Sequence, residues 1–384
     1  SEFDANSIAQ QVETGEVNLP EGGNASLGRV ISRAGTYFIQ VTGDDTTIDG
    51  GAYTLQARVE RPALEKAPVG THQILYLDFN GAVVATDIFG GTGAASLSPL
   101  SSFLGNWGFT AADESALIDS VISKVEEYLS TDIRAFGNNG DFLTSGIPGE
   151  FDIEIRNSRD HADPFGQAHV SRVIIGGTQG ELGVQTIGIS EGLDVGNLDT
   201  TESAVVLLDV LSGQVTPQSP FNINNIPFAA GTTKLDLVGA AIAGAAAHEA
   251  GHFFGLFHTN NANNVPNLMD VGGAGIGVYL GLGQDGIFGS PDDTNIGFIT
   301  PDAYIDFVGT EDTLNALSWS LSTGKLPSSV TGVKFHDLNS NGIRDLTEPG
   351  LPNWTIYADL DGDGMLGLRE PRTTTSSNGT YTLS

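Results

Sequence analysis

Residues 248–258 concentrate the side chains in this sequence that can bind a metal ion and move a proton. They read His-Glu-Ala-Gly-His-Phe-Phe-Gly-Leu-Phe-His and hold three of the seven histidines in the 384-residue chain. On a helix, His248 and His252 are four residues apart, so both imidazoles leave one face about one turn apart. This spacing lets both rings reach one Zn²⁺ at about 2.0–2.1 Å.

Gly255 and His258 extend the pattern to a third ligand. Glycine readily adopts the left-handed conformation that ends a helix, so we expect the chain to turn at Gly255 and return His258 to the metal. Three protein ligands leave one position open for water or substrate, as in catalytic zinc sites. Glu249 follows the first ligand, and we expect its carboxylate to take a proton from the zinc-bound water.

This stretch resembles the metzincin metallopeptidases, whose pattern H-E-x-x-H-x-x-G-x-x-H is followed by a Met-turn. Residues 267–270, Asn-Leu-Met-Asp, are the candidate Met-turn. The resemblance implies that Met269 forms an apolar floor under the zinc. Thr259, directly after the third histidine, is more similar to the pappalysin branch than to matrixins or astacins. No tyrosine directly follows the Met-turn, and Tyr279 is the candidate for a tyrosine near the zinc.

The resemblance also implies an α+β fold for residues 67–328, a metzincin-like catalytic domain flanked by small β domains. In it, a twisted mixed sheet is packed by a backing helix and by the zinc helix. Apolar residues at helical spacing predict the backing helix over residues 110–136. Thr233 and Asp236 form a capping pair at the start of the zinc helix, whose Ala- and Gly-rich part allows close packing.

Alternating or uniformly apolar runs predict the strands of this domain. They cover residues 73–79, 151–156, 171–177, 184–190 and 204–211. The resemblance implies that the strand at 184–190 borders the active-site cleft. An extended protein or peptide substrate would then pair with it as an additional strand.

The composition limits the choice of partners. The 16 Lys and Arg residues against 47 Asp and Glu give a net charge of 16 − 47 = −31. A field this negative repels nucleic acid and anionic membrane surfaces, so we expect neither as a partner, whereas it suits a Ca²⁺-binding protein. No apolar run is long enough to cross a bilayer, which predicts no membrane insertion. Cysteine is absent, which excludes disulfides and thiolate ligands.

Residues 1–66 are expected to form a partial β domain with a linker. Residues 35–42 and 52–59 alternate as strands and resemble the end of the pre-peptidase C-terminal domain of secreted bacterial peptidases. Residues 1–20 lack the basic start of a signal peptide, so we expect a mature fragment of a longer precursor. The loop between the two strands is either a calcium site or a solvated acidic turn; its acidic residues are Asp44, Asp45 and Asp49.

Residues 329–384 carry two loops with the twelve-residue calcium pattern. The ligand positions of the first loop hold Asp337, Asn339, Asn341, Asp345 and Glu348. Those of the second loop hold Asp359, Asp361, Asp363 and Glu370. The flanking segments alternate like strands, so this part resembles the SdrD B-like calcium-bound β-sandwich of bacterial surface proteins, here in partial form. The resemblance implies structural Ca²⁺ in both loops.

Three other polar stretches leave two interpretations open each. His161, Asp163 and His169 are either ligands of a second metal or loop side chains that bond to backbone and water. The acidic loops at 192–199 and 285–293 are either calcium sites or ordinary loops.

Together these features predict a secreted, calcium-stabilised zinc endopeptidase with Glu249 as its general base. The flanking β domains suit attachment to a cell surface or matrix. Two alternatives stay open: a surface or matrix protein whose zinc domain is an inactive relic, and a zinc hydrolase of other substrates such as cell-wall peptides.

Overall fold

The computed structural model describes most of the chain between residues 61 and 383. The described residues are 30, 36, 61–68, 70–137, 151–215, 217–263, 265–272, 275–299, 302–303, 310–323, 330–358, 366 and 372–383. The chain divides into two compact units, residues 1–324 and 325–384. The three-part division expected from the sequence stays a prediction, because nearly all of residues 1–66 lie outside the described residues.

A five-stranded sheet forms the centre of the first unit, in the spatial order β4-β1-β5-β7-β6. The four strands β4, β1, β5 and β7 are mutually parallel, and β6 pairs antiparallel with β7 at one edge. Their bounds are β1 Gln73–Asp78, β4 Ile153–Asn157, β5 Val170–Ile175, β6 Gly188–Ser190 and β7 Ser203–Val206. The unit is therefore a mixed α/β fold with a mainly parallel mixed sheet.

Two predicted strands are much shorter in the structure than in the sequence interpretation, whereas the other three differ from it by at most two residues at each end. The run at 184–190 contributes only Gly188–Ser190 to the sheet, although it does form an edge strand as expected. The run at 204–211 leaves the sheet after Val206, and Leu208–Leu211 forms the short helix α4. This part of the prediction was wrong because a uniformly apolar run does not distinguish a buried strand from a buried helix.

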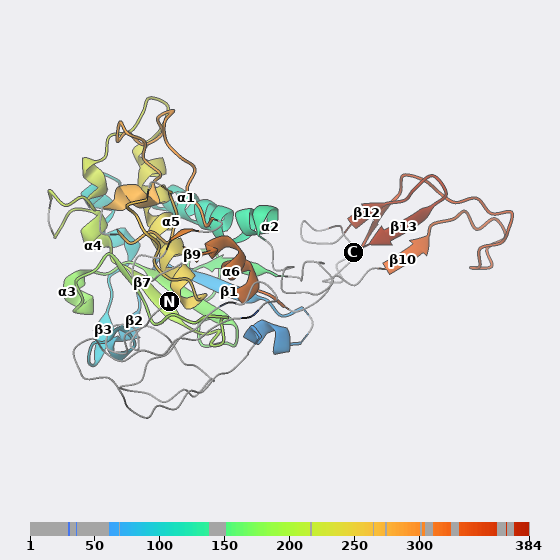
Figure 1. Ribbon diagram of the computed structural model, residues 1–384, viewed down its shortest axis with the longest axis horizontal. Helices are drawn as coiled ribbons and strands as arrows, with labels where there is room; N and C mark the ends of the chain where they lie inside the picture. The colour runs from blue at the N-terminus through green and yellow to red at the C-terminus, as the bar shows by residue number, and fades with distance from the viewer. Residues whose placement is uncertain are drawn as a thin grey trace. The chain divides into compact units, whose positions relative to one another are not determined.

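The two faces of the sheet pack against different elements. The helices α1 (Glu114–Glu126) and α5 (Lys234–Phe253) lie together on one side of the sheet (Figure 1). The main core beneath them includes Leu75, Leu77, Val173 and Val206. Ile174 is the neighbour of Val173, and Val205 is the neighbour of Val206, so their side chains point to the opposite face of the sheet. Both belong to a second core on that face. That core is covered by the hairpin β2 (Val83–Ala85) and β3 (Ala94–Ser96) and by α3 (Gln179–Leu182).

The backing helix is present and nearly continuous from Glu114 to Phe136. It consists of α1 (Glu114–Glu126), a π-helical turn (Glu127–Thr131) and α2 (Asp132–Phe136). It begins later than expected because Thr110 and Asp113 close a preceding turn, in which the Thr110 backbone N–H donates to the Asp113 carboxylate at 2.8 Å. The apolar residues that predicted the helix are buried, namely Leu117, Ile118, Val121, Val125, Tyr128 and Leu129.

The helix α5 (Lys234–Phe253) carries the residues of the candidate site. It opens with the predicted capping box: the Asp236 carboxylate accepts from the Thr233 backbone N–H at 2.8 Å, and the Thr233 hydroxyl oxygen accepts from the Asp236 backbone N–H at 3.2 Å. Its small residues allow close packing: a Cβ at Gly239 would collide with the Ser120 side chain of α1. A Cβ at Gly244 would lie 2.9 Å from the backbone oxygen of Tyr279.

The remaining elements of the first unit are short. β8 (Asp302–Ala303) pairs antiparallel with β9 (Thr310–Glu311), and α6 (Thr313–Ser320) follows, capped by Asp312. Helical 3₁₀ turns lie at Ala63–Lys66, Thr86–Phe89, Leu100–Ser102, Leu104–Trp107, Ile223–Asn225 and Ile276–Tyr279.

The second unit contains two antiparallel strand pairs among its described residues. β10 (Val330–Val333) pairs with β13 (Thr380–Leu383), and β11 (Thr355–Tyr357) pairs with β12 (Arg372–Thr374). Strands, rather than helices, therefore flank the first predicted calcium loop, as the alternating pattern indicated. In neither unit is any described helix long and apolar enough to cross a bilayer.

Candidate metal centre

The chain turns sharply at Gly255, immediately after α5. Gly255 has a φ of +90°, and its backbone N–H donates to the carbonyl oxygen of His252 at 2.8 Å. A Cβ at this position would lie 2.6 Å from the Cα atom of Val195, so both the backbone conformation and the available space require glycine. The turn predicted from the sequence is therefore present, and it brings His258 back toward the helix.

Three imidazoles converge at this turn. The Nε2 atoms of His248, His252 and His258 lie 3.2 Å from one another in all three pairs. Four ligands arranged tetrahedrally at about 2.0–2.1 Å from an ion are separated by roughly 3.3–3.4 Å. The spacing of the three nitrogen atoms thus fits a small four-coordinate metal ion with one position left open.

Backbone carbonyl groups fix the orientation of two of these rings. His248 Nδ1 lies 2.7 Å from the carbonyl oxygen of Leu268, and His252 Nδ1 lies 2.9 Å from that of Leu256. A carbonyl oxygen only accepts hydrogen bonds, so each Nδ1 carries the proton and each Nε2 presents a lone pair. Two lone pairs that face each other at 3.2 Å repel unless a cation lies between them, which makes this donor set suitable for a metal ion.

Burial keeps both rings in the neutral form that a metal requires. Burial, and then the neighbouring His258, lower the pKa of His248 to about 3 despite the hydrogen bond to Leu268. The pKa of His252 is also well below its usual value, first because of burial and then because of the two other histidines. Neither ring therefore needs to lose a proton at neutral pH before it can bind a metal.

The candidate Met-turn lies beside α5. Met269 is fully buried, and its Sδ atom lies 2.5 Å from where a Cβ of Gly251 would stand, so it packs directly on the helix between the first two histidines. Thr259 joins this turn to the third histidine: its N–H donates to the Met269 carbonyl at 2.8 Å, and its hydroxyl donates to Asp270 at 2.9 Å. The sequence interpretation did not anticipate this function of Thr259 and Asp270.

Glu249 is buried directly after His248, the first candidate ligand. Its side chain lies against Gly188 of the edge strand, since a Cβ on Gly188 would stand 2.8 Å from both Cγ and Cδ of Glu249. Burial raises the pKa of Glu249 to about 8. A carboxylate with a raised pKa is a stronger base than an exposed one, and a nearby cation would lower that pKa again.

Tyr279 also reaches the centre. Its ring centroid lies 5.0 Å from that of His248, and its side chain is buried. Burial raises the pKa of Tyr279 well above its usual value, and the charges of Glu249 and Asp270 add to the effect. The hydroxyl is therefore protonated at neutral pH. The candidate tyrosine from the sequence is thus placed beside one of the three histidines.

The structure does not bring His161, Asp163 and His169 within coordination distance of one another. His161 Nδ1 bonds to the backbone of Asn157 at 3.3 Å, and His169 Nδ1 lies 3.1 Å from the Thr200 hydroxyl. These contacts favour the interpretation as loop side chains over that of a second metal site.

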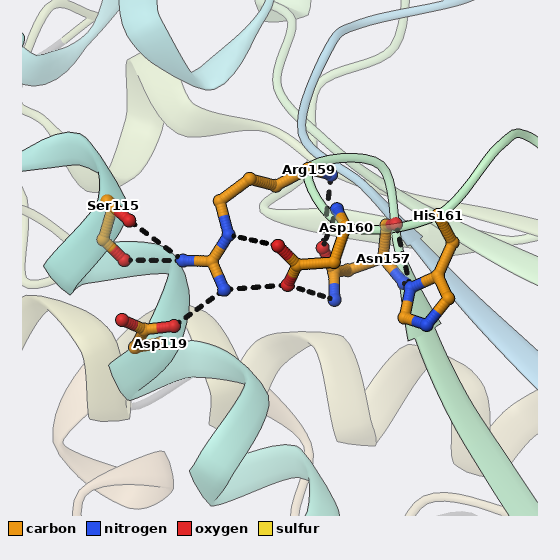
Figure 2. A network of polar contacts seen from close by, with 6 residues as sticks. All are labelled: Ser115, Asp119, Asn157, Arg159, Asp160 and His161. Atoms are coloured by element: carbon orange, nitrogen blue, oxygen red, sulfur yellow. Dashed lines mark hydrogen bonds and ion pairs between the residues drawn. The ribbon is translucent and has the colours of Figure 1, made fainter.

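Arg159 fixes the loop that contains His161 to the backing helix (Figure 2). Its guanidinium group donates to the Ser115 carbonyl at 2.9 Å and pairs with Asp119 at 2.7 Å, both on α1. The same group bonds to both carboxylate oxygens of Asp160, at 2.8 and 2.6 Å. The polar side chains of this loop thus hold the loop in place after β4.

The first predicted calcium loop is closed by its own polar side chains. Glu348 is buried and accepts from the Leu338 and Asp345 N–H groups at 2.8 and 3.0 Å. The side-chain amides of Asn339 and Asn341 both donate to Asp345, at 2.6 and 3.1 Å. Calcium binding by these residues stays a prediction. The second set lies outside the described residues, namely Asp359, Asp361, Asp363 and Glu370, as do Asp44, Asp45 and Asp49.

Both interpretations of the two other acidic loops stay open. Carboxylate oxygens of Asp285, Asp292 and Asp293 lie within 4.8 Å of one another, but backbone N–H groups of the same loop already donate to them. In the loop at 192–199, Asp194 is buried and accepts from the Asp199 N–H at 2.7 Å.

No protein-family model matches this chain, and no curated protein matches it. The geometry of the site itself therefore carries the functional argument.

Proposed function

We propose that this protein is a zinc-dependent endopeptidase of the metzincin type. The observation that supports this function most strongly is the convergence of His248, His252 and His258 at 3.2 Å, with the buried Glu249 directly after the first of them.

In this proposal the three Nε2 atoms hold Zn²⁺. A set of three imidazole nitrogens favours Zn²⁺ over Ca²⁺ or Mg²⁺, which prefer oxygen ligands. The bound ion would supply Lewis acidity, which lowers the pKa of water and polarises a carbonyl group. The carbonyl groups of Leu268 and Leu256 keep the first two rings aimed at the ion.

Glu249 moves the proton. It accepts the proton of the water that attacks the scissile carbonyl and then passes it to the leaving amine. Its buried position excludes bulk water, which supports its function as a base.

The edge strand supports an extended peptide as the substrate. The Ile187 carbonyl oxygen accepts a hydrogen bond from the Leu207 N–H at 2.7 Å. The Glu191 N–H donates to the Ser203 carbonyl oxygen at 2.9 Å. The backbone N–H and C=O groups of the odd-numbered residues in this segment therefore face β7. In an antiparallel ladder the intervening residues, Gly188 and Ser190, direct their backbone groups away from that partner. An extended peptide can pair there, next to Glu249.

Two further parts of the proposal concern the surroundings of the enzyme. Ca²⁺ stabilises the second unit through the loop at 337–348, where the buried Glu348 and the polar groups around Asp345 support a bound ion. The enzyme acts in secreted form or at a cell surface, a setting supported by the acidic composition, which suits a Ca²⁺-binding protein.

The test compares the parent protein with two variants. Casein cleavage should disappear when a chelator removes the metal and return when Zn²⁺ is added. Glu249→Gln should keep one Zn²⁺ per chain, measured by mass spectrometry, and lose roughly 10²–10⁴-fold in turnover. His252→Ala should lose both metal and activity. If Glu249→Gln cleaves casein at the parent rate, the proposed mechanism is wrong.

A further inference from the structure

The backbone conformation at position 188 does not require glycine. Gly188 lies in β6, and its φ is outside the left-handed region that other residues avoid. Glycine weakens a strand, because it loses more conformational freedom on folding and has no side chain to pack. A different physical reason must therefore explain a glycine at this position.

That reason is the space occupied by Glu249. A Cβ on Gly188 would lie 2.8 Å from both Cγ and Cδ of Glu249 and still closer to Oε1. Carbon atoms in contact are normally separated by about 3.5–4.0 Å. The Glu249 side chain thus fills the volume that any side chain at position 188 would need.

The edge strand is held more firmly than the carboxylate. Gly188, Ile189 and Ser190 pair with β7, and the Ile187 and Ile189 side chains pack against the second core. The clashing atoms of Glu249, in contrast, are the far end of a side chain with rotatable bonds. An added methyl group would therefore displace the carboxylate rather than the strand.

The metal ligands are oriented by other contacts. His248 and His252 bond to the carbonyl groups of Leu268 and Leu256, neither of which belongs to β6. A displaced Glu249 thus leaves the Nε2 atoms of His248 and His252 in place.

We propose that Gly188 is a positioning residue of the active site: the absence of a side chain there sets the position of the Glu249 carboxylate beside the metal centre. This inference rests on the proposed function, in which Glu249 is the general base. Position 188 of the edge strand thus helps to place the catalytic carboxylate, although Gly188 itself has no group that reacts.

The first experiment is the Gly188→Ala variant. We expect one Zn²⁺ per chain as in the parent, a KM close to that of the parent, and a kcat lower by roughly 10²-fold, as for a displaced catalytic group. The matched control is Gly105→Ala, because a Cβ on Gly105 meets no atom within 4 Å and its φ is also outside the left-handed region. This control should keep the parent kcat.

The second experiment does not depend on activity. It compares the Tm of the parent, Gly188→Ala, Glu249→Ala and the double variant. If the clash is with Glu249, Gly188→Ala lowers the Tm of the parent by more than it lowers the Tm of the Glu249→Ala protein. Equal decreases in both backgrounds would overturn the inference.

The two proposals fail in different ways. If the parent has no chelator-sensitive cleavage, the proposed function is wrong, and the Tm comparison still decides whether Gly188 positions Glu249. If the parent is active and Gly188→Ala keeps the parent kcat, or loses its Zn²⁺, the inference is wrong and the proposed function stands.

Discussion

The Nδ1 atom of His248 donates a hydrogen bond to the carbonyl oxygen of Leu268, 2.7 Å away and twenty residues later in the chain. This bond joins the helix that carries the first candidate ligand to the turn that contains Met269. It fixes the tautomer of the ring and aims Nε2 at the two other histidines. The site therefore depends on two segments that pack together and on the turn between them.

The turn at Gly255 should be sensitive to a single methyl group. In Gly255→Ala the alanine must adopt a positive φ, and its Cβ also clashes with Val195. The left-handed backbone alone costs roughly 1–2 kcal/mol. Because the clash adds to this cost, we expect a larger decrease in the free energy of unfolding. His258 should then be misplaced, which lowers the zinc content. Thermal unfolding and metal analysis measure both effects.

Gly183→Ala is the matched control for that variant. Gly183 has a similar φ of +81°, but a Cβ there meets no atom within 4 Å. Gly183→Ala should therefore lower the free energy of unfolding only by the contribution of the left-handed backbone, and it should leave the zinc content unchanged. Equal losses of stability in the two variants would contradict the importance of the Val195 contact.

The hydroxyl of Thr259 should contribute to metal affinity through Asp270. Thr259→Val keeps the shape of the side chain and removes the donor at 2.9 Å, which leaves a carboxylate oxygen of the buried Asp270 without this bond. We expect a loss of about 1–3 kcal/mol in stability and a roughly 10–100-fold weaker metal affinity. Competition with a zinc-binding dye measures the affinity. Thr92→Val, at an exposed position, should leave it unchanged.

The acid sensitivity of the sheet should depend on Glu154. Burial alone would raise its pKa, but hydrogen bonds from Arg156 and His72 outweigh burial and lower the pKa to about 2. Because the folded-state pKa lies below the unfolded value of about 4.3, this stabilisation is complete above that pH and is lost as pH falls toward 2.

The comparison with Glu154→Gln tests this dependence. The parent should be the more stable protein at pH 7, and the difference should shrink between about pH 4.5 and 2. Urea midpoints measured after chelation exclude any contribution from metal release. A difference that stays constant over this pH range would show that Glu154 stabilises the sheet without its charge.

The sequence predicted those features that depend on local spacing. Three features are each encoded within a few residues: the interval between His248 and His252, the glycine at 255, and the capping box at Thr233. The alternation of apolar residues likewise located strands such as β4, since burial of one face leaves a period of two. The edge position of residues 188–190 was expected from the family resemblance and is present.

Features that depend on long-range packing could not be predicted in this way. The run at 204–211 is apolar except for Asp209, and only the tertiary structure decides that its second half is helical. The contact between Gly188 and Glu249 joins residues 61 positions apart, and no local pattern distinguishes this glycine from others. The same holds for the Thr259–Asp270 bond, whose partners belong to separate turns.

The most direct test of the proposed zinc site is anomalous X-ray scattering from crystals of the protein, measured on both sides of the zinc absorption edge. We expect one strong peak at about 2.0–2.1 Å from the Nε2 atoms of His248, His252 and His258. The peak should persist in Glu249→Gln and vanish in His252→Ala. If the three rings point apart, or if zinc is bound only at other residues, His248, His252 and His258 do not form the zinc site.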